Sequence, residues 1–267
     1  MNGESDLEYT GERMIPESVD AWTLWEHLYR YRFALQFVRG KRVVDVACGE
    51  GYGSAAMLRA GAAGVIGLDV SPETCIHARQ KYGVDARPAD AHCLPLADAS
   101  VDTVVSFETI EHLSDPPRFL DECRRILAPG GKLVISTPNK SVYREHTPNN
   151  EFHTSELDES EFASLLASRF SLLRYYGQSA DTACWWWPRS LATHNSPWRD
   201  VKGYWRTKQW LFGRRQAHDL AQARQDPVEW LLRPEPALAF LFNPFRVRKR
   251  VHYAGEQPVY IVAVGVK

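Results

Sequence analysis

Side chains that could move a proton or hold a metal ion follow a short apolar run in the middle of the chain. The segment SFETIEHL (106–113) places Glu108, Glu111 and His112 close together. A carboxylate or an imidazole within hydrogen-bond reach of a hydroxyl can remove its proton, so all three are candidate catalytic bases. His112 could equally be a structural histidine that only makes hydrogen bonds, and the sequence leaves both interpretations open.

A second motif, VVDVACGEGYG (43–53), is suited to a nucleotide-type ligand. It joins an apolar run to three glycines at alternate positions, where the backbone can approach a ligand without interference from a Cβ atom. A dinucleotide fingerprint requires G-x-G-x-x-G, and Ser54 occupies its third glycine position here. No phosphate-binding lysine follows. The motif therefore predicts a nucleotide-type site and weakens the case for a pyrophosphate-bearing ligand.

Two aspartates extend this site. Asp69 ends the apolar run 64–70, about 18 residues after Gly51, where an acidic side chain can accept hydrogen bonds from both ribose hydroxyls. Asp90 follows the next extended region and would lie beside a base. The alternative for Asp69 is an ordinary surface aspartate, which its position at a strand end disfavours.

Apolar runs typical of strands alternate with helical patterns along most of the chain. Ser71, Pro72 and Glu73 form a helix start, with a capping serine and a proline in the first turn. Strands that alternate with helices predict an α/β protein with a mostly parallel sheet, in which ligands bind at the carboxyl ends of the strands. The predicted strands are 42–46, 64–70, 102–107, 131–137, 171–176 and 258–266, and the predicted helices are 19–38, 54–60, 116–127 and 156–168.

The alternating rhythm is lost from residue 183 to about residue 243, where tryptophan and arginine are frequent. Residues 188–252 hold thirteen Lys or Arg against five Asp or Glu, which predicts an anionic partner. An alternative of equal weight is that this segment forms a small subdomain with an aromatic core and a solvated surface. We predict four parts: an N-terminal helical lid (1–40), a core (41–182), an acceptor-side insertion (183–250) and a final core strand (251–267). The alternation in 245–253 further predicts a hairpin with that strand.

The composition of the chain argues against several classes of protein. The five cysteines contain no C-x-x-C pair, which argues against a disulfide framework and a cysteine zinc site. No apolar run approaches the roughly 20 residues of a membrane span, and the N-terminus does not resemble a signal peptide. We therefore expect a cytoplasmic protein with no transmembrane segment.

Four segments in order resemble the motifs of class I S-adenosylmethionine-dependent methyltransferases: VDVACGEG, GLDVS, ADAHCLPLADASVDTVVS and LAPGGKLVISTPN. The resemblance covers about residues 40–140 and implies a Rossmann-like three-layer αβα sandwich, mostly parallel with an antiparallel last strand, plus the Trp/Arg-rich insertion. It also implies S-adenosylmethionine as cofactor. On this resemblance the methionine part is held by Asp45, Ala47, Gly49 and Gly51, the ribose by Asp69, the adenine by Asp90 and Ala91, and Val70 and Phe107 contact the same ligand.

The segments YTGERMIPE (9–17) and HLYRYRFA (27–34) look like the lead-in of a bacterial group of these enzymes that modifies glycans or natural products. On that resemblance Arg13 can pair with the carboxylate of the cofactor. A helix over residues 19–38 that simply packs on the sheet is the alternative, and it is compatible with this resemblance. The implied lid consists of Tyr9, Gly11, Glu12, Arg13, His27 and Tyr31.

The E-x-x-E-H spacing also resembles the metal-ligand set of small-RNA 2′-O-methyltransferases, and a related motif occurs in ubiquinone-pathway O-methyltransferases. His153 lies between STPN (136–139) and Glu161-Phe162, which matches the position of the fourth ligand. Two carboxylates and two imidazoles would suit Mg²⁺ or Mn²⁺ holding two vicinal hydroxyls. The implied ligands are Glu108, Glu111, His112 and His153. A site without metal is the alternative, because relatives with E-x-x-E-H and no recognised metal exist.

Together these features predict methyl transfer from S-adenosylmethionine to a sugar hydroxyl of a bacterial glycan or glycosylated metabolite. The acceptor could carry a phosphate, because arginine forks bind phosphate well. O- or N-methylation of a natural product, RNA 2′-O-methylation and a catalytically silent cofactor-binding module are the alternatives. Nucleic acid is disfavoured as a partner, because it would require a continuous basic surface.

Overall fold

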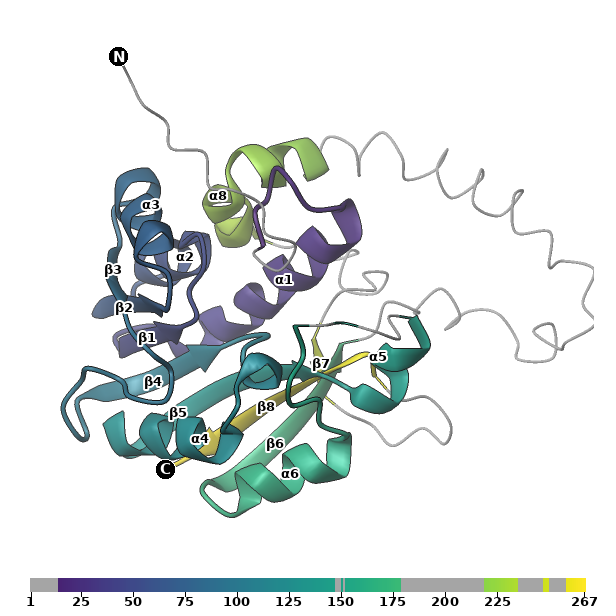
Figure 1. Cartoon of the computed structure of the whole chain (residues 1–267). Coiled ribbons are helices and arrows are strands. Elements are labelled where there is room, and N and C mark those ends of the chain that lie inside the picture. The colour runs from purple at the N-terminus through teal and green to yellow at the C-terminus, as the bar shows by residue number, and fades with distance from the viewer. Residues whose placement is uncertain (1–13, 147–149, 151, 179–218, 235–246, 250–257) are drawn as a thin grey trace, which may run out of the picture.

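The computed structural model describes residues 14–146, 150, 152–178, 219–234, 247–249 and 258–267. An eight-stranded sheet, in the order β3-β2-β1-β4-β5-β8-β6-β7, lies between two layers of helices (Figure 1). Separate apolar cores fill the two faces of the sheet. The predicted three-layer α/β sandwich is confirmed.

Five strands run parallel and end at one edge of the sheet. The last strand, β8 (Tyr260–Val266), runs antiparallel, as predicted, and lies between β5 and β6 (Ser171–Gln178). Residues that follow the parallel strands therefore gather at the same edge. The parallel strands are β1 (Arg42–Val46), β2 (Gly64–Asp69), β3 (Asp85–Pro88), β4 (Val101–Ser106) and β5 (Leu127–Pro138).

The predicted hairpin between residues 245–253 and the final strand is wrong. The described part of that segment, β7 (Arg248–Lys249), pairs with β6 and not with β8. The physical reason is that β8 already has β5 on one side and β6 on the other, so no edge of β8 is open. An alternating sequence predicts a strand but does not choose its partner.

One face of the sheet carries α1 (Ala21–Ala34), α2 (Tyr52–Arg59), α3 (Pro72–Tyr82) and α8 (Pro227–Leu232). Leu24 and Leu28 of α1 are fully buried, so this helix is part of the core. Helix α3 begins as predicted, because the Ser71 hydroxyl accepts a hydrogen bond from the Thr74 amide at 3.2 Å.

The other face carries α4 (Pro116–Ile126) and α6 (Glu159–Ala167). Helix α4 buries Phe119, Leu120 and Cys123, and a capping box between Asp158 and Glu161 starts α6. Shorter elements connect the strands to these helices: η1 (Leu35–Phe37), η2 (Ile110–His112) and α5 (Lys140–His146).

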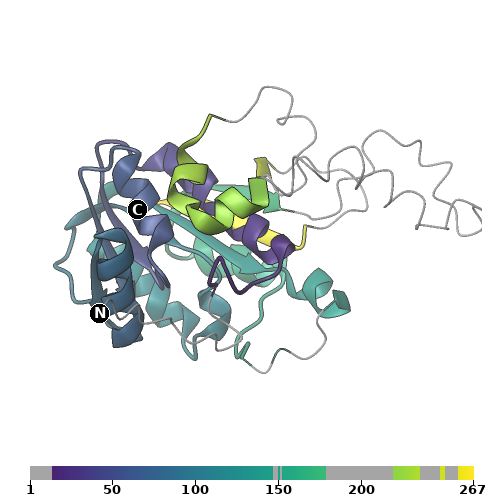
Figure 2. The same ribbon diagram turned by 90° about the horizontal axis from the view of Figure 1, so that it is seen from above.

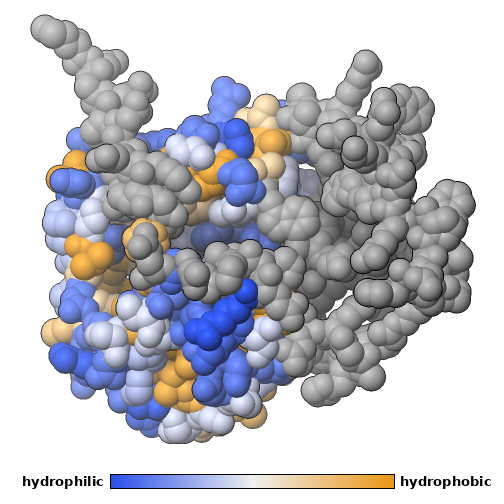
Figure 3. All heavy atoms as spheres, turned by 45° about the vertical axis from the view of Figure 1, so that its right-hand side comes forward, coloured by the Kyte–Doolittle hydropathy of each residue, from blue (hydrophilic) through white to orange (hydrophobic). Residues whose placement is uncertain are grey.

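No helix in the described part of the chain is long and apolar enough to cross a membrane. On the side of the molecule shown in Figure 3, hydrophilic residues predominate among those coloured, and the hydrophobic ones form small separate patches.

The described part of the Trp/Arg-rich segment, residues 219–234, packs on α1, and Figure 2 shows α8 lying across that helix. Trp230 is buried with its ring centroid 5.0 Å from that of Trp25 and 5.3 Å from that of Tyr29. Arg32 donates to the Trp230 carbonyl at 2.6 Å, and its guanidinium lies 4.3 Å from the ring centroid. This tryptophan therefore contributes to a core. The other six tryptophans predicted for the acceptor side lie outside the described residues.

Replacing Trp230 with alanine should lower the free energy of unfolding by about 3–5 kcal/mol, because a large buried aromatic is removed from a packed cluster. Denaturant unfolding of both proteins measures this difference. Glu229→Ala is the matched control, since its exposed side chain lies next to Trp230 in α8 and should change stability by about 0.5 kcal/mol at most. Equal stability of Trp230→Ala and the parent protein would contradict the packing role.

Candidate active site

The loop between β1 and α2 is shaped by residues with positive φ. Ala47, Gly49 and Gly51 have φ values of 58°, 53° and 97°. A Cβ on Gly51 would lie 2.6 Å from the Ala78 Cβ, so this glycine is required by packing against α3. A Cβ on Gly49 would meet nothing within 4 Å. The loop is therefore open at Gly49, where the sequence predicted close approach of a ligand.

Asp69 fixes this loop from the end of β2. One carboxylate oxygen accepts the Gly49 amide at 2.9 Å, and the other accepts the Ser71 amide at 3.0 Å. Each carboxylate oxygen has a second lone pair, so Asp69 can still accept hydrogen bonds from two ribose hydroxyls. Val70 follows with 78% of its surface exposed, which is unusual for valine and suits a residue that a bound ring would cover.

Asp45 lies beneath the loop and is fully buried. Its carboxylate accepts hydrogen bonds from the Ser54 hydroxyl at 2.6 Å and from the Tyr31 hydroxyl at 3.2 Å. Burial raises the pKa of Asp45 to about 7, although both hydrogen bonds favour the charged form. The Tyr31 ring contacts the predicted cofactor residue Phe107, with centroids 5.2 Å apart. Asp45 is thus held beneath the loop by Ser54 and Tyr31.

Asp90 and Ala91 follow β3, whose end is aligned with Asp69. The Asp90 carboxylate accepts the His92 backbone amide and contacts the His92 ring, each at 2.8 Å, and these bonds lower the pKa of Asp90. The side chain is largely exposed. Asp90 therefore lies one strand beyond Asp69, and its contact with adenine stays a prediction.

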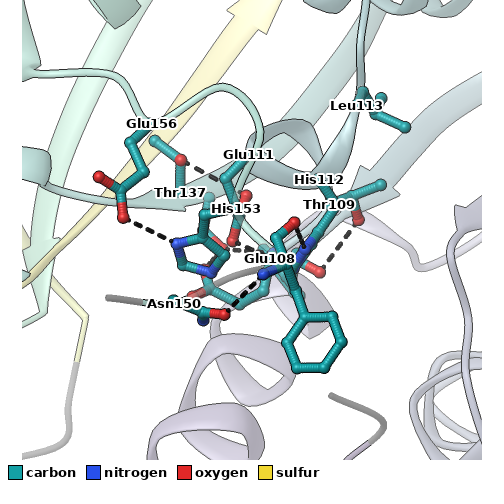
Figure 4. Close-up of polar contacts among 12 residues, drawn as sticks. Glu108, Thr109, Glu111, His112, Leu113, Thr137, Asn150, His153 and Glu156 are labelled. Atoms are coloured by element: carbon teal, nitrogen blue, oxygen red, sulfur yellow. Dashed lines mark hydrogen bonds and ion pairs between the residues drawn. The ribbon is translucent and has the colours of Figure 1, made fainter. Parts of the chain in front are cut away.

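Glu111, His112 and His153 form one cluster, with one potential ligand atom from each residue within 4.8 Å of the others. Glu111 and His112 belong to η2, immediately after β4. His153 comes from a distant loop that is tied to η2, because the Thr154 and Ser155 amides both donate to the Glu111 carbonyl at 2.9 Å. Figure 4 shows the three side chains lying together, with Glu156 beside His153.

Hydrogen bonds orient both imidazoles. His112 Nδ1 lies 3.1 Å from the Phe152 carbonyl, which can only accept, so in the neutral ring Nδ1 carries the proton and Nε2 carries the lone pair. His153 Nδ1 lies 3.1 Å from the Glu156 carboxylate, with both side chains almost fully buried. A histidine held by a carboxylate in this way is the usual arrangement behind a metal ligand.

Glu111 is the buried carboxylate of the cluster. Its Oε2 accepts a 3.4 Å hydrogen bond from Thr137, whereas its Oε1 has no hydrogen-bond partner among the residues that the structure describes. Burial, together with the nearby charge of Glu108, raises the pKa of Glu111 well above its usual range. A buried carboxylate oxygen without a hydrogen bond is costly, so a proton or a cation would stabilise Oε1, and His112 Nε2 lies 4.0 Å from it.

Glu108, the fourth predicted ligand, is not part of this three-residue cluster. Its carboxylate accepts a 2.6 Å hydrogen bond from Ser136 at the end of β5 and lies 3.9 Å from the buried guanidinium of Arg30. Sequence reasoning missed Arg30. The only available signal was a charged residue next to Tyr31 in a helix predicted to pack on the sheet.

Several predicted site residues lie outside the described part of the chain, namely Tyr9, Gly11, Glu12 and Arg13. Their proposed roles in a lid and in pairing with the cofactor remain predictions. His27 and Tyr31 lie on α1, and burial lowers the pKa of His27, with a further contribution from the charge of Arg30.

Comparison with known proteins agrees with this geometry. Residues 44–135 match the family described as methyltransferase domain. A protein of Mycolicibacterium smegmatis named probable S-adenosylmethionine-dependent methyltransferase is 43% identical over 167 residues, covering 61% of this chain and 64% of that protein. A ubiquinone biosynthesis O-methyltransferase of Cereibacter sphaeroides is 38% identical over 107 residues, covering 38% of this chain and 43% of that protein. The chain thus spans less than two thirds of the length of these relatives.

Solved structures share the fold. An S-adenosylmethionine-dependent methyltransferase of Thermotoga maritima superposes with a TM-score of 0.55 at 21% identity, covering 92% of this chain and 93% of that chain. One from Mesorhizobium loti also gives a TM-score of 0.55, at 17% identity, covering 89% and 95%. Residues 44–135 therefore match a methyltransferase domain, and the chain shares its fold with S-adenosylmethionine-dependent methyltransferases.

Replacing Asp69 with alanine should weaken S-adenosylhomocysteine binding by about 1.5–3 kcal/mol, or roughly 10- to 150-fold in Kd, because a charged acceptor of two hydrogen bonds is lost. Isothermal titration calorimetry measures this change. Asp85→Ala is the control, since Asp85 begins β3 at the opposite edge and is exposed. Unchanged affinity in Asp69→Ala would reject this placement of the cofactor.

Proposed function

We propose that this protein transfers the methyl group of S-adenosylmethionine to a hydroxyl of a sugar in a bacterial glycan or glycosylated metabolite. The observation that carries the proposal is the position of the Glu111, His112 and His153 cluster. It follows β4, at the sheet edge that also holds the Gly49 loop and Asp69. Groups able to handle a hydroxyl therefore lie beside the predicted cofactor pocket.

Methyl transfer needs little covalent catalysis by the protein, because a sulfonium methyl is already activated. The protein must align the acceptor with the methyl group and take up the proton of the hydroxyl. In a site without a cation, we assign His112 as the base, because its Nδ1–H is directed at the Phe152 carbonyl and its Nε2 carries the lone pair. When a cation is bound, the same lone pair binds the cation instead. Its imidazole is partly exposed, so an acceptor can reach it.

We also propose that Glu111, His112 and His153 hold a divalent cation such as Mg²⁺ or Mn²⁺. The fit rests on the unpaired buried oxygen of Glu111 and on the Glu156 carboxylate that orients His153. One carboxylate and two imidazoles form a donor set that divalent metals accept. When bound, the cation would draw acceptor hydroxyls together and ease the loss of their protons.

Hydroxyl acceptors are supported by the similarity to ubiquinone biosynthesis O-methyltransferases. The acceptor-side assignment of residues 183–250 is supported by its described flanks, because Gln178 pairs with Tyr260 and Tyr260 pairs with Pro138 at the carboxyl end of β5. Arginine and tryptophan in that segment suit a phosphate-bearing sugar. Natural-product methylation, RNA 2′-O-methylation and a silent cofactor-binding module are the competing functions.

Metal removal tests the cation. EDTA should abolish turnover and Mg²⁺ or Mn²⁺ should restore it, while His153→Ala should lose Mn²⁺ binding in calorimetry and keep its affinity for S-adenosylhomocysteine. His77→Ala is the control, because His77 lies on α3, contacts Glu50 in the loop before α2 and is not part of the cluster. Full activity after exhaustive chelation would leave His112 acting without a metal.

The acceptor is tested by incubating the protein with methyl-labelled cofactor and separate sugar, nucleotide-sugar, phenolic and RNA acceptors. Mass spectrometry should find the label on a sugar hydroxyl, with one S-adenosylhomocysteine formed for each methyl transferred. A label found only on RNA or on a phenol would replace the sugar with that acceptor. No S-adenosylhomocysteine with any acceptor would favour the silent module.

A further inference from the structure

Arg30 lies on the sheet-facing side of α1 and is fully buried. Gln178 at the end of β6 accepts one of its hydrogen bonds at 2.7 Å, and the Tyr260 ring of β8 lies with its centroid 4.5 Å from the guanidinium carbon. Tyr260 and Gln178 are themselves bonded to Glu26, one helical turn earlier in α1. Arg30 is therefore held in one position from three elements.

The guanidinium is not fully satisfied by these contacts. Nε and Nη2 are buried and have no hydrogen-bond partner among the described residues. A buried positive charge requires a nearby negative charge, because its desolvation is otherwise uncompensated. Nε lies 3.9 Å from Glu108 Oε1, which makes Glu108 the carboxylate that compensates Arg30 at the site.

Glu108 is fixed from the other side as well. Its φ of 50° is in the left-handed region, which is strained for a residue with a Cβ atom. Ser136 holds both ends of the residue, accepting the Glu108 amide at 3.3 Å and donating to Oε1 at 2.6 Å. Ser136 and Arg30 both contact Oε1 of Glu108. These two contacts together fix the direction in which Oε2 points.

We propose that Arg30 is a positioning residue for the methyl acceptor and that it acts through Glu108. With Oε1 held by Ser136 and Arg30, Oε2 of the partly exposed Glu108 accepts the hydrogen bond of an acceptor hydroxyl and aligns it for methyl transfer. This role rests on the proposed function, since it requires a hydroxyl acceptor at the end of β4. Helix α1 would then contribute to acceptor binding as well as to the predicted cofactor site.

A double-mutant cycle of Arg30→Met and Glu108→Gln tests the proposal, with acceptor kcat/KM and the Kd of S-adenosylhomocysteine measured for each variant. Each single change should lower kcat/KM by about tenfold or more, and the double variant should be no worse than Glu108→Gln, because residues that act through one contact are not additive. The cofactor Kd should stay within about twofold, since this contact does not include the cofactor loop. Arg39→Met, which removes an exposed arginine just after η1, should leave kcat/KM unchanged.

Multiplied losses in the double variant would overturn the proposal, because they would show that Arg30 acts independently of Glu108. If Arg30→Met does not fold, Ser136→Ala replaces it in the cycle, and an unchanged acceptor kcat/KM in that variant overturns the proposal as well. Wild-type protein that turns over no hydroxyl acceptor at all would instead overturn the proposed function, and this role with it.

Discussion

The direction of the central strands is the constraint on which the site depends. Because β1, β2, β3, β4 and β5 run parallel, their carboxyl ends meet at one edge, and a candidate site residue lies at the end of nearly every one of them. Asp69 then holds the Gly49 amide, so the second strand shapes the loop that follows the first. Antiparallel β8 keeps this edge continuous, because it brings Tyr260 next to Pro138.

Around that edge the chain buries charges that do not favour folding by themselves. Asp45, Glu111 and Arg30 are all fully buried, and the pKa values of both acids are raised by burial. Positive φ values at Ala47 and Glu108 add backbone strain at the same place. The buried charges and the strained backbone lie where the orientation of the site's side chains matters. The apolar cores on the two faces of the sheet supply the stability of the fold.

The strands and the cofactor loop could be predicted because their signals are local. Apolar runs of strand length, the glycine spacing and the Ser71-Pro72 helix start each depend on neighbouring residues. Arg30 could not be predicted in the same way, because α1 is buried on nearly all sides and its apolar periodicity marks no single face. The pairing of β7 with β6 depends on tertiary packing, which no local pattern encodes. The Glu156 contact of His153 spans only three residues, and its signal was a carboxylate close to a predicted ligand.

The most direct measurement is a crystal structure of the protein with S-adenosylhomocysteine and Mn²⁺, recorded so that the anomalous signal locates the metal. We expect the cofactor product along Gly49 and Asp69, with its sulfur facing the residues after β4, and the Mn²⁺ peak on Glu111, His112 and His153. A product bound at another edge of the sheet, or an anomalous peak away from these three side chains, would contradict the account.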